Sequence, residues 1–355
     1  MKSLVLFLSR HKTVSAGIVT LFLFSSCKQS PETFAIHSPV YPSSTAAVTY
    51  TLHKLNGSVE SVKLYVSTSN VDASGNLSGT TTESLVKTWD SPSSFPLSFT
   101  SSSGYGANKL VTYHFEIKGN NKTYNHRISF ATNPYPVANV PAPVYTVGEA
   151  DRVMNVVFIP DTDISNNMNT FYTHVGRDID SAFHREDWIR RFPYSYNFYI
   201  NPFTGHAGDY DAGTAHTLPS NSANLSFAQA NIILHSGNWR DFRSGNYIGT
   251  EYYNRGTILH ETGHALYNMA DEYVGGSHWQ NADLPNTWSS LSGAQTAASG
   301  VGKNSSDAVK IGSDPWWKLC NGQCMMLNTG LTIFPYDKPC QNRILFSLLQ
   351  RAGGN

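Results

Sequence analysis

Residues Thr257 to Tyr273 read TILHETGHALYNMADEY and place His260, Glu261 and His264 in the pattern HExxH. On a helix, residues four apart lie one above the other on the same face, so both imidazoles can bind one metal ion. A bound zinc ion lowers the pKa of its water to about 7. Glu261 would lie beside that water and could accept its proton as the water attacks a carbonyl carbon. The pattern therefore predicts one catalytic Zn²⁺ and hydrolysis of peptide bonds, with Glu261 as the general base.

The residues around the motif favour a helix. Ile258, Leu259, Ala265, Leu266 and Met269 are apolar and recur at helical spacing. Such a stripe is typical of a helix that packs against a core. We therefore expect a helix that is buried on one side and presents the metal ligands on the other.

A third protein ligand is needed, because catalytic zinc usually has three together with a water. If the helix continued, Asp271 would lie about 10 Å along its axis from His264, too far to share the ion. Asn268 tolerates the left-handed conformation that ends many helices. A chain that turns there would return Asp271 to the metal as the third ligand. Glu272 is the close alternative, and either carboxylate could instead hydrogen-bond to a ligand histidine.

The extended motif HETGHALYNMADEY resembles the HExxHxxxxxxDEY signature of the IgA-peptidase-like family of bacterial zinc metallopeptidases, which are related to the metzincins. MNVVFIPDTDI, residues 154–164, resembles the opening strand of that family and its following Asp loop. CMML, residues 324–327, resembles its Met-turn. The likeness runs roughly from Asp151 to the C-terminus. The family name describes a founding substrate and does not imply that this chain cuts IgA.

The resemblance implies a metzincin-like α/β zinc peptidase domain. It also implies that Met326 lies beneath the zinc, although Met325 and Met326 could simply be core residues. An edge strand in the segment 236–250 would line the cleft and pair with an extended substrate.

The chain begins with charged residues, among them Lys2 and Arg10, followed by a mostly apolar run over 13–24 and FSSC ending at Cys27. The apolar run is too short to span a membrane. Small residues before a cysteine are typical of a bacterial lipoprotein signal. We expect residues 1–27 to be a signal peptide ending at an acylated Cys27, with the protein anchored to the outer membrane or cell surface. An ordinary cleaved signal with an incidental cysteine is the alternative.

The formal net charge is +0 and 14% of the residues are charged. This composition offers no basic face for nucleic acid and no polybasic patch for a membrane surface. We therefore expect a protein or peptide substrate as the partner, with membrane contact through the lipid anchor only. The oligomeric state stays open.

Three further cysteines, Cys320, Cys324 and Cys340, would allow one disulfide in an oxidising compartment. A Cys324–Cys340 bond would close a loop around the Met-turn, which the chain-entropy model values at about 3 kcal/mol. The pairing stays open. Three cysteines without a paired CxxC motif favour a disulfide over a cysteine–zinc site.

The sequence divides into a strand-rich part and a mixed part, so the predicted fold is multidomain α+β. Residues 28–133 contain short alternating runs such as AVTYTL and LVTYHFEI between turn residues, which predicts an immunoglobulin-like β-sandwich. Residues 134–146 are rich in proline and are expected to form an extended linker. Residues 147–355 would then form the zinc metallopeptidase domain.

Within that domain, apolar runs predict strands at 154–159, 196–203 and 230–236, and a helix over 168–183. Strands that alternate with a helix suggest a mixed α/β sheet. Residues 274–309 are expected to form surface loop around the cleft, and 343–351 a closing helix.

A polar loop at 203–225 contains His206, Asp209, Asp211 and His216. These residues could hold a structural metal, but their irregular spacing favours a solvated loop.

Two other functions compete with a peptidase. The first is a surface adhesion or binding lipoprotein on an inactive peptidase scaffold, against which the intact Glu261 argues. The second is glycan binding by the sandwich, which would need an exposed aromatic stripe.

Overall fold

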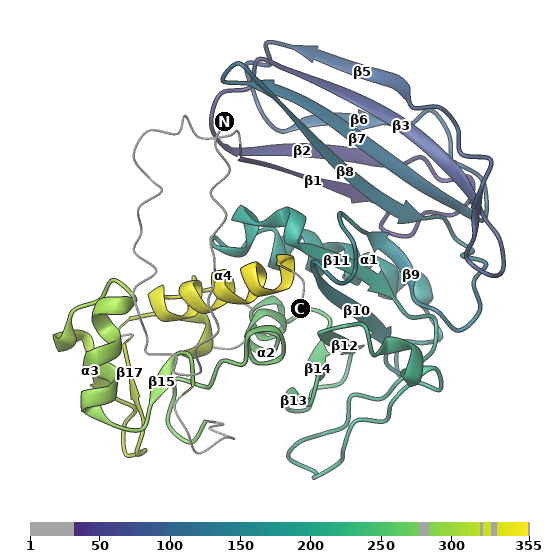
Figure 1. The fold of residues 1–355 in the computed structure, drawn as a ribbon. Helices are drawn as coiled ribbons and strands as arrows, with labels where there is room; N and C mark the ends of the chain where they lie inside the picture. Colours follow the sequence, from purple (N-terminus) through teal and green to yellow (C-terminus); the bar gives the residue numbers. More distant parts are fainter. Residues whose placement is uncertain (1–31, 277–283, 320–321, 328–331, 354–355) are drawn as a thin grey trace.

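The computed structural model describes residues 32–276, 284–319, 322–327 and 332–353. The fold is rich in β-structure, with four sheets and few helices (Figure 1). No helix within these ranges is long and apolar enough to cross a membrane. The predicted signal peptide 1–27, with Cys27, lies outside the described residues.

The N-terminal part contains two antiparallel sheets. One has the strand order β1-β2-β6 and the other the order β4-β3-β7-β8, with β5 paired to β3. The strands are β1 (Glu32–Ser38), β2 (Thr49–Asn56), β3 (Ser61–Val71), β4 (Leu77–Ser78), β5 (Ser84–Asp90), β6 (Leu97–Thr100), β7 (Lys109–Gly119) and β8 (Lys122–Ala131).

These two sheets pack against each other through alternating side chains. On β7, Val111, Tyr113, Phe115 and Ile117 are all buried, as expected when every second residue points to the core. Tyr113 stacks on Tyr50 of β2 in the other sheet, with ring centroids 3.8 Å apart. The strand pattern predicted for 28–133 is thus present from Glu32 onward, in two facing layers.

The second part is built on a six-stranded mixed sheet in the order β13-β14-β12-β10-β11-β9. The four central strands are parallel, and β9 and β13 are antiparallel at the two edges. Every residue of β10 and β12 is buried, as is usual for parallel strands covered on both faces. The bounds are β9 (Ala142–Tyr145), β10 (Met154–Pro160), β11 (Tyr196–Ile200), β12 (Ala230–His235), β13 (Phe242–Ser244) and β14 (Tyr247–Glu251).

Strand β9 lies inside the segment 134–146 that the sequence suggests as a linker. Pro143 is tolerated there because β9 is an edge strand, where the missing N–H need not face a partner. Thr146 also exchanges backbone hydrogen bonds with Ser129 of β8. Part of the expected linker is therefore a strand, and it connects the large sheet to the N-terminal sheets.

Four α-helices lie in the described residues: α1 (Met168–Asp178), α2 (Arg255–Tyr267), α3 (Leu291–Gly300) and α4 (Lys338–Ala352). A π-helical turn, Ile179–Phe183, continues α1. Five 3₁₀ turns are Ile189–Arg191, Pro193–Ser195, Ser222–Leu225, Ser305–Asp307 and Met325–Leu327. The closing helix thus begins five residues before the predicted start, because Asp337 caps it and Pro339 fits its first turn.

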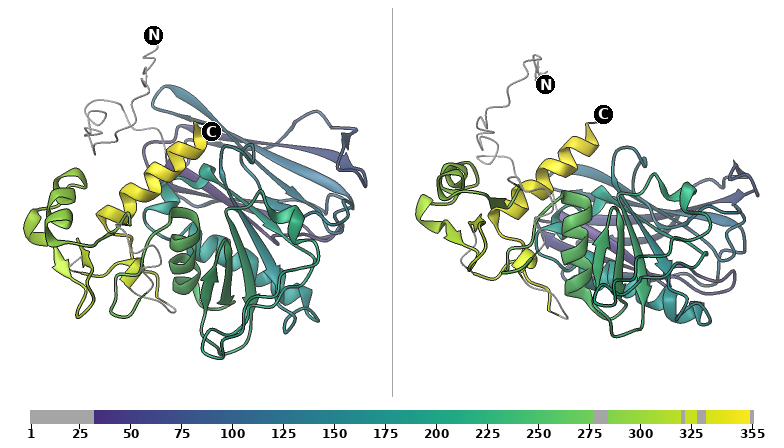
Figure 2. Two further views of the ribbon diagram at one scale, coloured as in Figure 1. Left: turned by 60° about the horizontal axis from the view of Figure 1, so that its bottom comes forward. Right: turned by 90° about the horizontal axis from the view of Figure 1, so that it is seen from below.

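Helix α2 is buried nearly all round, with only Arg255 and Ala265 of its residues outside the buried class. It runs beside the strands of the large sheet and contacts α4 (Figure 2). The expectation of a helix buried on one side only is therefore wrong. The ligand-bearing side is buried as well, because the 3₁₀ turn Met325–Leu327 packs against it.

The expected surface loop at 274–309 contains regular structure. Helix α3 and strand β15 (Thr287–Trp288) lie there. Strand β15 belongs to a small sheet with β16 (Val309–Lys310) and β17 (Trp317–Lys318), which follow at the end of the segment and just beyond it. The helix buries Ala294 and Ala298, which are four residues apart on one face. Periodicity did not reveal it because its buried side chains are small.

Candidate metal centre

Helix α2 ends where the sequence predicts. Asn268 follows the last helical residue with φ 55° and ψ 41°, the left-handed conformation. Its N–H donates to the His264 carbonyl at 3.1 Å, and the Met269 N–H donates to the Gly263 carbonyl at 3.3 Å. These bonds satisfy carbonyls that the helix end would leave exposed. The chain then turns back and brings Asp271 beside the two histidines.

Three ligand atoms converge at this point. His260 Nε2 lies 2.9 Å from Asp271 Oδ1, and His264 Nε2 lies 3.2 Å from the same oxygen. The two Nε2 atoms are 3.1 Å apart. All three side chains are at most 5% exposed. The three atoms thus form a nearly equilateral triangle that can share one metal ion.

In each imidazole, the hydrogen bond of Nδ1, the nitrogen that points away from Asp271, shows where a proton lies. His260 Nδ1 donates to the Met325 carbonyl at 3.0 Å, and His264 Nδ1 donates to the Met269 carbonyl at 2.7 Å. A carbonyl can only accept, so each Nδ1 bears a proton. Each Nε2 therefore faces Asp271 and can either bind a metal ion through its lone pair or carry a second proton that it donates to the carboxylate. Metal-ligating histidines are usually oriented in this way.

The charges of this cluster depend on one another. Burial disfavours ionisation of Asp271, but the hydrogen bonds from His260 and His264 outweigh burial and hold the pKa of Asp271 well below its usual range. Burial also opposes a charge on His260, yet the Asp271 carboxylate raises the pKa of His260 to about 9. A buried carboxylate here needs a positive charge, which a proton or a metal ion can supply.

Glu261 lies beside the cluster, farther from the histidines than Asp271 does. A ligand atom of Glu261 lies within 4.8 Å of those of His260 and His264, and its side chain borders the cleft. Burial raises the pKa of Glu261, whereas the neighbouring histidines act in the opposite direction. This placement suits a base that acts on a water at the cluster.

The structure separates the two carboxylates that the sequence left as alternatives. Glu272 is 1% exposed, and its Oε1 accepts from the side-chain amide of Asn286 at 2.9 Å. The same oxygen lies 3.5 Å from Cys340 Sγ. Asp271, and not Glu272, is therefore the carboxylate beside the histidines.

Met326 lies directly against α2. A Cβ atom on Gly263 would lie 2.5 Å from Met326 Sδ, so only glycine leaves room for this methionine. The preceding Met325 supplies the carbonyl that orients His260. The turn Met325–Leu327 thus packs against the helix that bears the two histidines, and both methionines are fully buried core residues.

A cleft of about 720 Å³ opens above the cluster. Glu261, His264, Asp271 and Tyr273 belong to its lining. The edge strand β13 contributes Phe242 and Arg243. The sequence did not single out several lining residues, among them the aromatic and basic residues Tyr210, Trp239, Arg240, Phe242 and Arg243. Their only sequence signal is that aromatic and basic residues gather in an otherwise Gly- and Asn-rich stretch.

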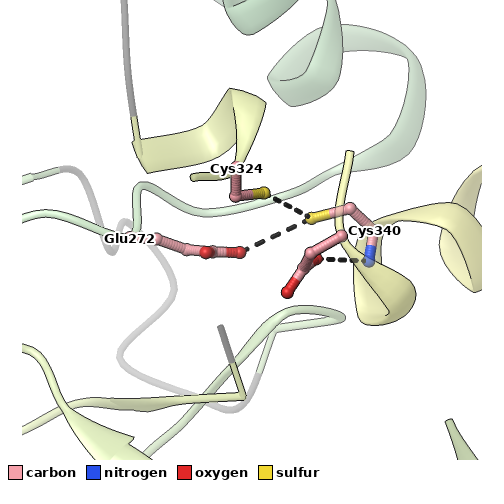
Figure 3. A group of neighbouring side chains, drawn as sticks. Glu272, Cys324 and Cys340 are labelled. Atoms are coloured by element: carbon pink, nitrogen blue, oxygen red, sulfur yellow. Dashed lines mark hydrogen bonds between the residues drawn. The ribbon is translucent and has the colours of Figure 1, made fainter. Parts of the chain in front are cut away.

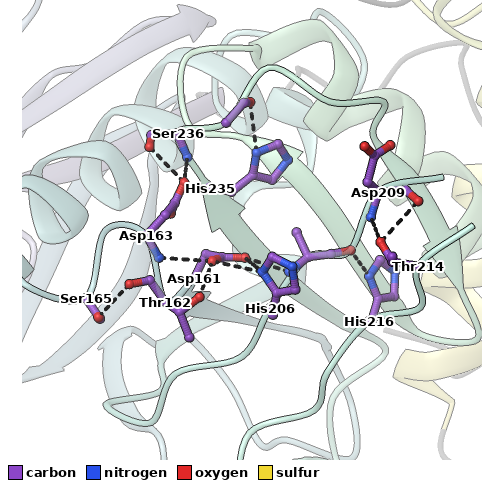
Figure 4. A network of polar contacts seen from close by, with 12 residues as sticks. Asp161, Thr162, Asp163, Ser165, His206, Asp209, Thr214, His216, His235 and Ser236 are labelled. Carbon is purple, nitrogen blue, oxygen red and sulfur yellow. Dashed lines mark hydrogen bonds and ion pairs between the residues drawn. The ribbon is translucent and has the colours of Figure 1, made fainter. Parts of the chain in front are cut away.

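Polar contacts at the ends of β10 and β12 hold the loops that border this cleft (Figure 4). Asp161 is fully buried, accepts the Ala207 N–H at 2.6 Å and lies 3.1 Å from His206 Nδ1. Asp163 accepts the N–H and the hydroxyl of Ser236, each at 2.8 Å. These aspartates follow the strand MNVVFIP and fix the loops that carry Tyr210 and Trp239.

The polar loop 203–225 does not gather a metal site among the described residues. His216 Nδ1 donates to the Ala207 carbonyl, and Asp209 accepts backbone N–H groups of its own turn. Within the part of the chain that the structure describes, two groups of His, Cys, Asp and Glu could hold a metal, and neither includes this loop.

Comparisons with known proteins leave the family open. No family model matches the chain, and no curated protein matches it. Among solved structures, a cycloisomaltooligosaccharide glucanotransferase from Paenibacillus sp., in complex with cycloisomaltoheptaose, is 9% identical with a TM-score of 0.22. The match covers 56% of this chain and 27% of that protein. A likeness this weak says nothing about fold or activity.

Proposed function

We propose that this chain is a zinc-dependent endopeptidase. The observation that carries the proposal is the convergence of His260, His264 and Asp271 at the floor of a cleft, with Glu261 beside them. Ligands at 2.0–2.1 Å around a tetrahedral zinc lie roughly 3.3 Å apart. The three observed edges of 2.9, 3.1 and 3.2 Å are close to that spacing. Two imidazoles and a carboxylate are also donors that zinc accepts.

In this proposal each residue has a distinct role. The histidines and Asp271 would hold the ion, and a zinc ion bound there would polarise a water and lower its pKa. Glu261 accepts the proton of that water and returns it to the leaving amine. Strand β13 is an edge strand of the sheet formed by the described residues and contributes to the cleft lining, so an extended peptide can pair beside it.

The resemblance to the IgA-peptidase-like family agrees with this arrangement and motivates the finer fold assignment. We propose a metzincin-like catalytic domain preceded by an immunoglobulin-like sandwich. Export and a lipid anchor at Cys27 stay predictions of the sequence, and membrane fractionation of Cys27→Ala tests them.

Glu261→Gln tests the proposed function. The amide keeps the size of the side chain but cannot accept the proton, and loss of a positioned base costs about 10²- to 10⁴-fold. The kcat for cleavage of a peptide library should fall by that factor, whereas zinc content and the unfolding transition should stay unchanged. Glu149→Gln, an exposed carboxylate outside the cleft, is the control and should cut like wild type.

The alternative is an adhesion lipoprotein on the same scaffold. It would be supported if zinc-replete wild type cuts nothing in a broad library near neutral pH while both forms bind one partner equally well.

A further inference from the structure

A second cluster of ligand-type side chains lies behind the metal centre. It comprises Glu272, Cys324, Asp337 and Cys340, which offer one ligand atom each, all within 4.8 Å of one another. Figure 3 shows Glu272 and the two cysteines pointing toward a common point from three separate segments. Cys324 precedes the Met-turn, whereas Asp337 and Cys340 begin α4.

The distances within the cluster differ from those of a disulfide. Cys324 Sγ and Cys340 Sγ are 3.8 Å apart, so they are in contact but not bonded to each other. A disulfide bond would place them about 2.05 Å apart. Four ligands at the bond lengths that zinc makes to sulfur and oxygen place two sulfurs roughly 3.8 Å apart, and a sulfur and an oxygen roughly 3.5 Å apart. The Cys340 Sγ to Glu272 Oε1 distance is 3.5 Å.

Burial and hydrogen bonding are consistent with a ligand at this point. Both cysteines are 0% exposed and Glu272 is 1% exposed. Asp337 Oδ1 caps α4 by accepting the Cys340 N–H at 3.2 Å. Asp337 Oδ2 is buried and makes no hydrogen bond within the described residues. A buried carboxylate oxygen of this kind is costly unless a cation or a donor lies against it.

One ammonium group, that of Lys318, contacts this segment and is engaged with the backbone. Lys318 Nζ donates to the carbonyl oxygen of Glu272 at 2.8 Å, not to its carboxylate. A divalent cation bound by all four side chains would offset part of their negative charge directly.

We propose that Glu272, Cys324, Asp337 and Cys340 form a second, structural zinc site. Two thiolates select zinc over magnesium or calcium, and four protein ligands away from a cleft are the arrangement of a closed structural site. Because the four residues come from three segments, the ion would tie the segment after Asp271, the Met-turn and α4 together. It would thereby fix the position of Asp271 and of the Met325 carbonyl that orients His260. The sequence did not show this site because two of its ligands are carboxylates without a cysteine-type motif.

Cobalt substitution of the wild-type protein tests the site without any mutation. Co²⁺ bound to thiolate gives a strong near-ultraviolet charge-transfer band, and the cluster of His260, His264 and Asp271 contains no sulfur. We expect this band, and we expect it to persist in the double variant His260→Ala/His264→Ala. Absence of the band, or a Cys324–Cys340 disulfide found by peptide mapping under non-reducing conditions, would overturn the proposal. The readout does not depend on peptidase activity.

Two variants sharpen the assignment. Cys340→Ser should remove the band and one zinc per chain. Asp337→Asn keeps an oxygen that can cap α4 but lowers the charge on the ion, so zinc affinity should fall at least about 10- to 100-fold. Asp307→Asn, which changes a carboxylate that caps a short helix elsewhere, should leave zinc affinity unchanged. Equal zinc affinity in Asp337→Asn and Asp307→Asn would exclude Asp337 as a ligand. If Cys340→Ser does not fold, the cobalt charge-transfer band of the wild-type protein decides whether the site exists.

Discussion

Asp271 and Glu272 are adjacent in the chain and both are buried, yet they end in different clusters. Asp271 joins two imidazoles at the floor of a cleft, and Glu272 joins two thiols beneath the Met-turn. The first cluster has three donors and borders open space, whereas the second has four donors and is closed. Catalytic zinc sites keep a position open, and structural sites do not. The two neighbouring carboxylates are chemically alike, so the number of donors in each cluster and its access to the cleft distinguish the proposed catalytic site from the proposed structural site.

The largest effect should come from exchanging each carboxylate for its amide. Asp271→Asn weakens the ligand set of the histidine cluster, so peptide cleavage should fall at least about 10²-fold, as on loss of a catalytic group. Glu272→Gln should reduce zinc at the thiol cluster and affect cleavage less. Zinc per chain and cleavage rate, measured on both variants, check the comparison. If Glu272→Gln strips the histidine-bound metal and Asp271→Asn does not, the assignment of the two carboxylates is reversed.

A third buried imidazole shows what the carboxylate contributes. No carboxylate among the described residues pairs with His37. Its ring stacks on Tyr50 and Phe130, and burial lowers its pKa to about 4. The unfolded chain, with a His pKa of about 6.5, therefore binds more protons than the folded chain between pH 6.5 and 4. Stability should fall by about 3 kcal/mol as the pH falls through this window, because 1 pKa unit is about 1.4 kcal/mol.

His37→Phe should remove this contribution, since the ring fits the aromatic surroundings and does not titrate. Urea unfolding at pH 7 and pH 4 measures the difference. An equal pH dependence in wild type and variant would contradict the buried neutral His37.

A smaller effect should follow from filling the space between α2 and the Met-turn. Gly263→Ala places a methyl group against Met326 Sδ, and overpacking of this kind typically costs about 1–3 kcal/mol. Gly300→Ala on α3 meets nothing within 4 Å and is the matched control, expected to be neutral or slightly stabilising. Thermal unfolding of both variants is the measurement, and equal melting temperatures would show that Met326 does not restrain α2.

Local sequence rules predicted the cluster that contains His260 and His264. They could not predict the cluster that contains Cys324 and Cys340. His260 and His264 are related by helix geometry, and Asn268 is one of few residues that tolerate φ 55°, so the helix end could be read from the sequence. The choice between Asp271 and Glu272 could not be read from the sequence. The two residues are adjacent, so the local backbone conformation decides which of their side chains points toward the histidines. Only tertiary packing brings Cys324 to Cys340, and the same holds for Tyr210, Trp239 and Arg243 in the cleft.

Some strands and helices could likewise be predicted from the sequence, and others could not. The alternation in β7 and the apolar runs in β10 and β12 were visible because burial imposes a pattern on side chains. Strand β9 could not be predicted because the prolines in and before it suggest a linker. Helix α3 could not be predicted because its buried face consists of alanines. Both lie where contacts with distant residues override a weak local preference.

Anomalous diffraction at the zinc edge, from crystals grown with zinc, tests the central claim most directly. The account predicts a peak bonded to His260 Nε2, His264 Nε2 and an oxygen of Asp271, with the carboxylate of Glu261 beside an open coordination position. A histidine pair without a peak, or a peak that takes Glu272 in place of Asp271, would contradict it.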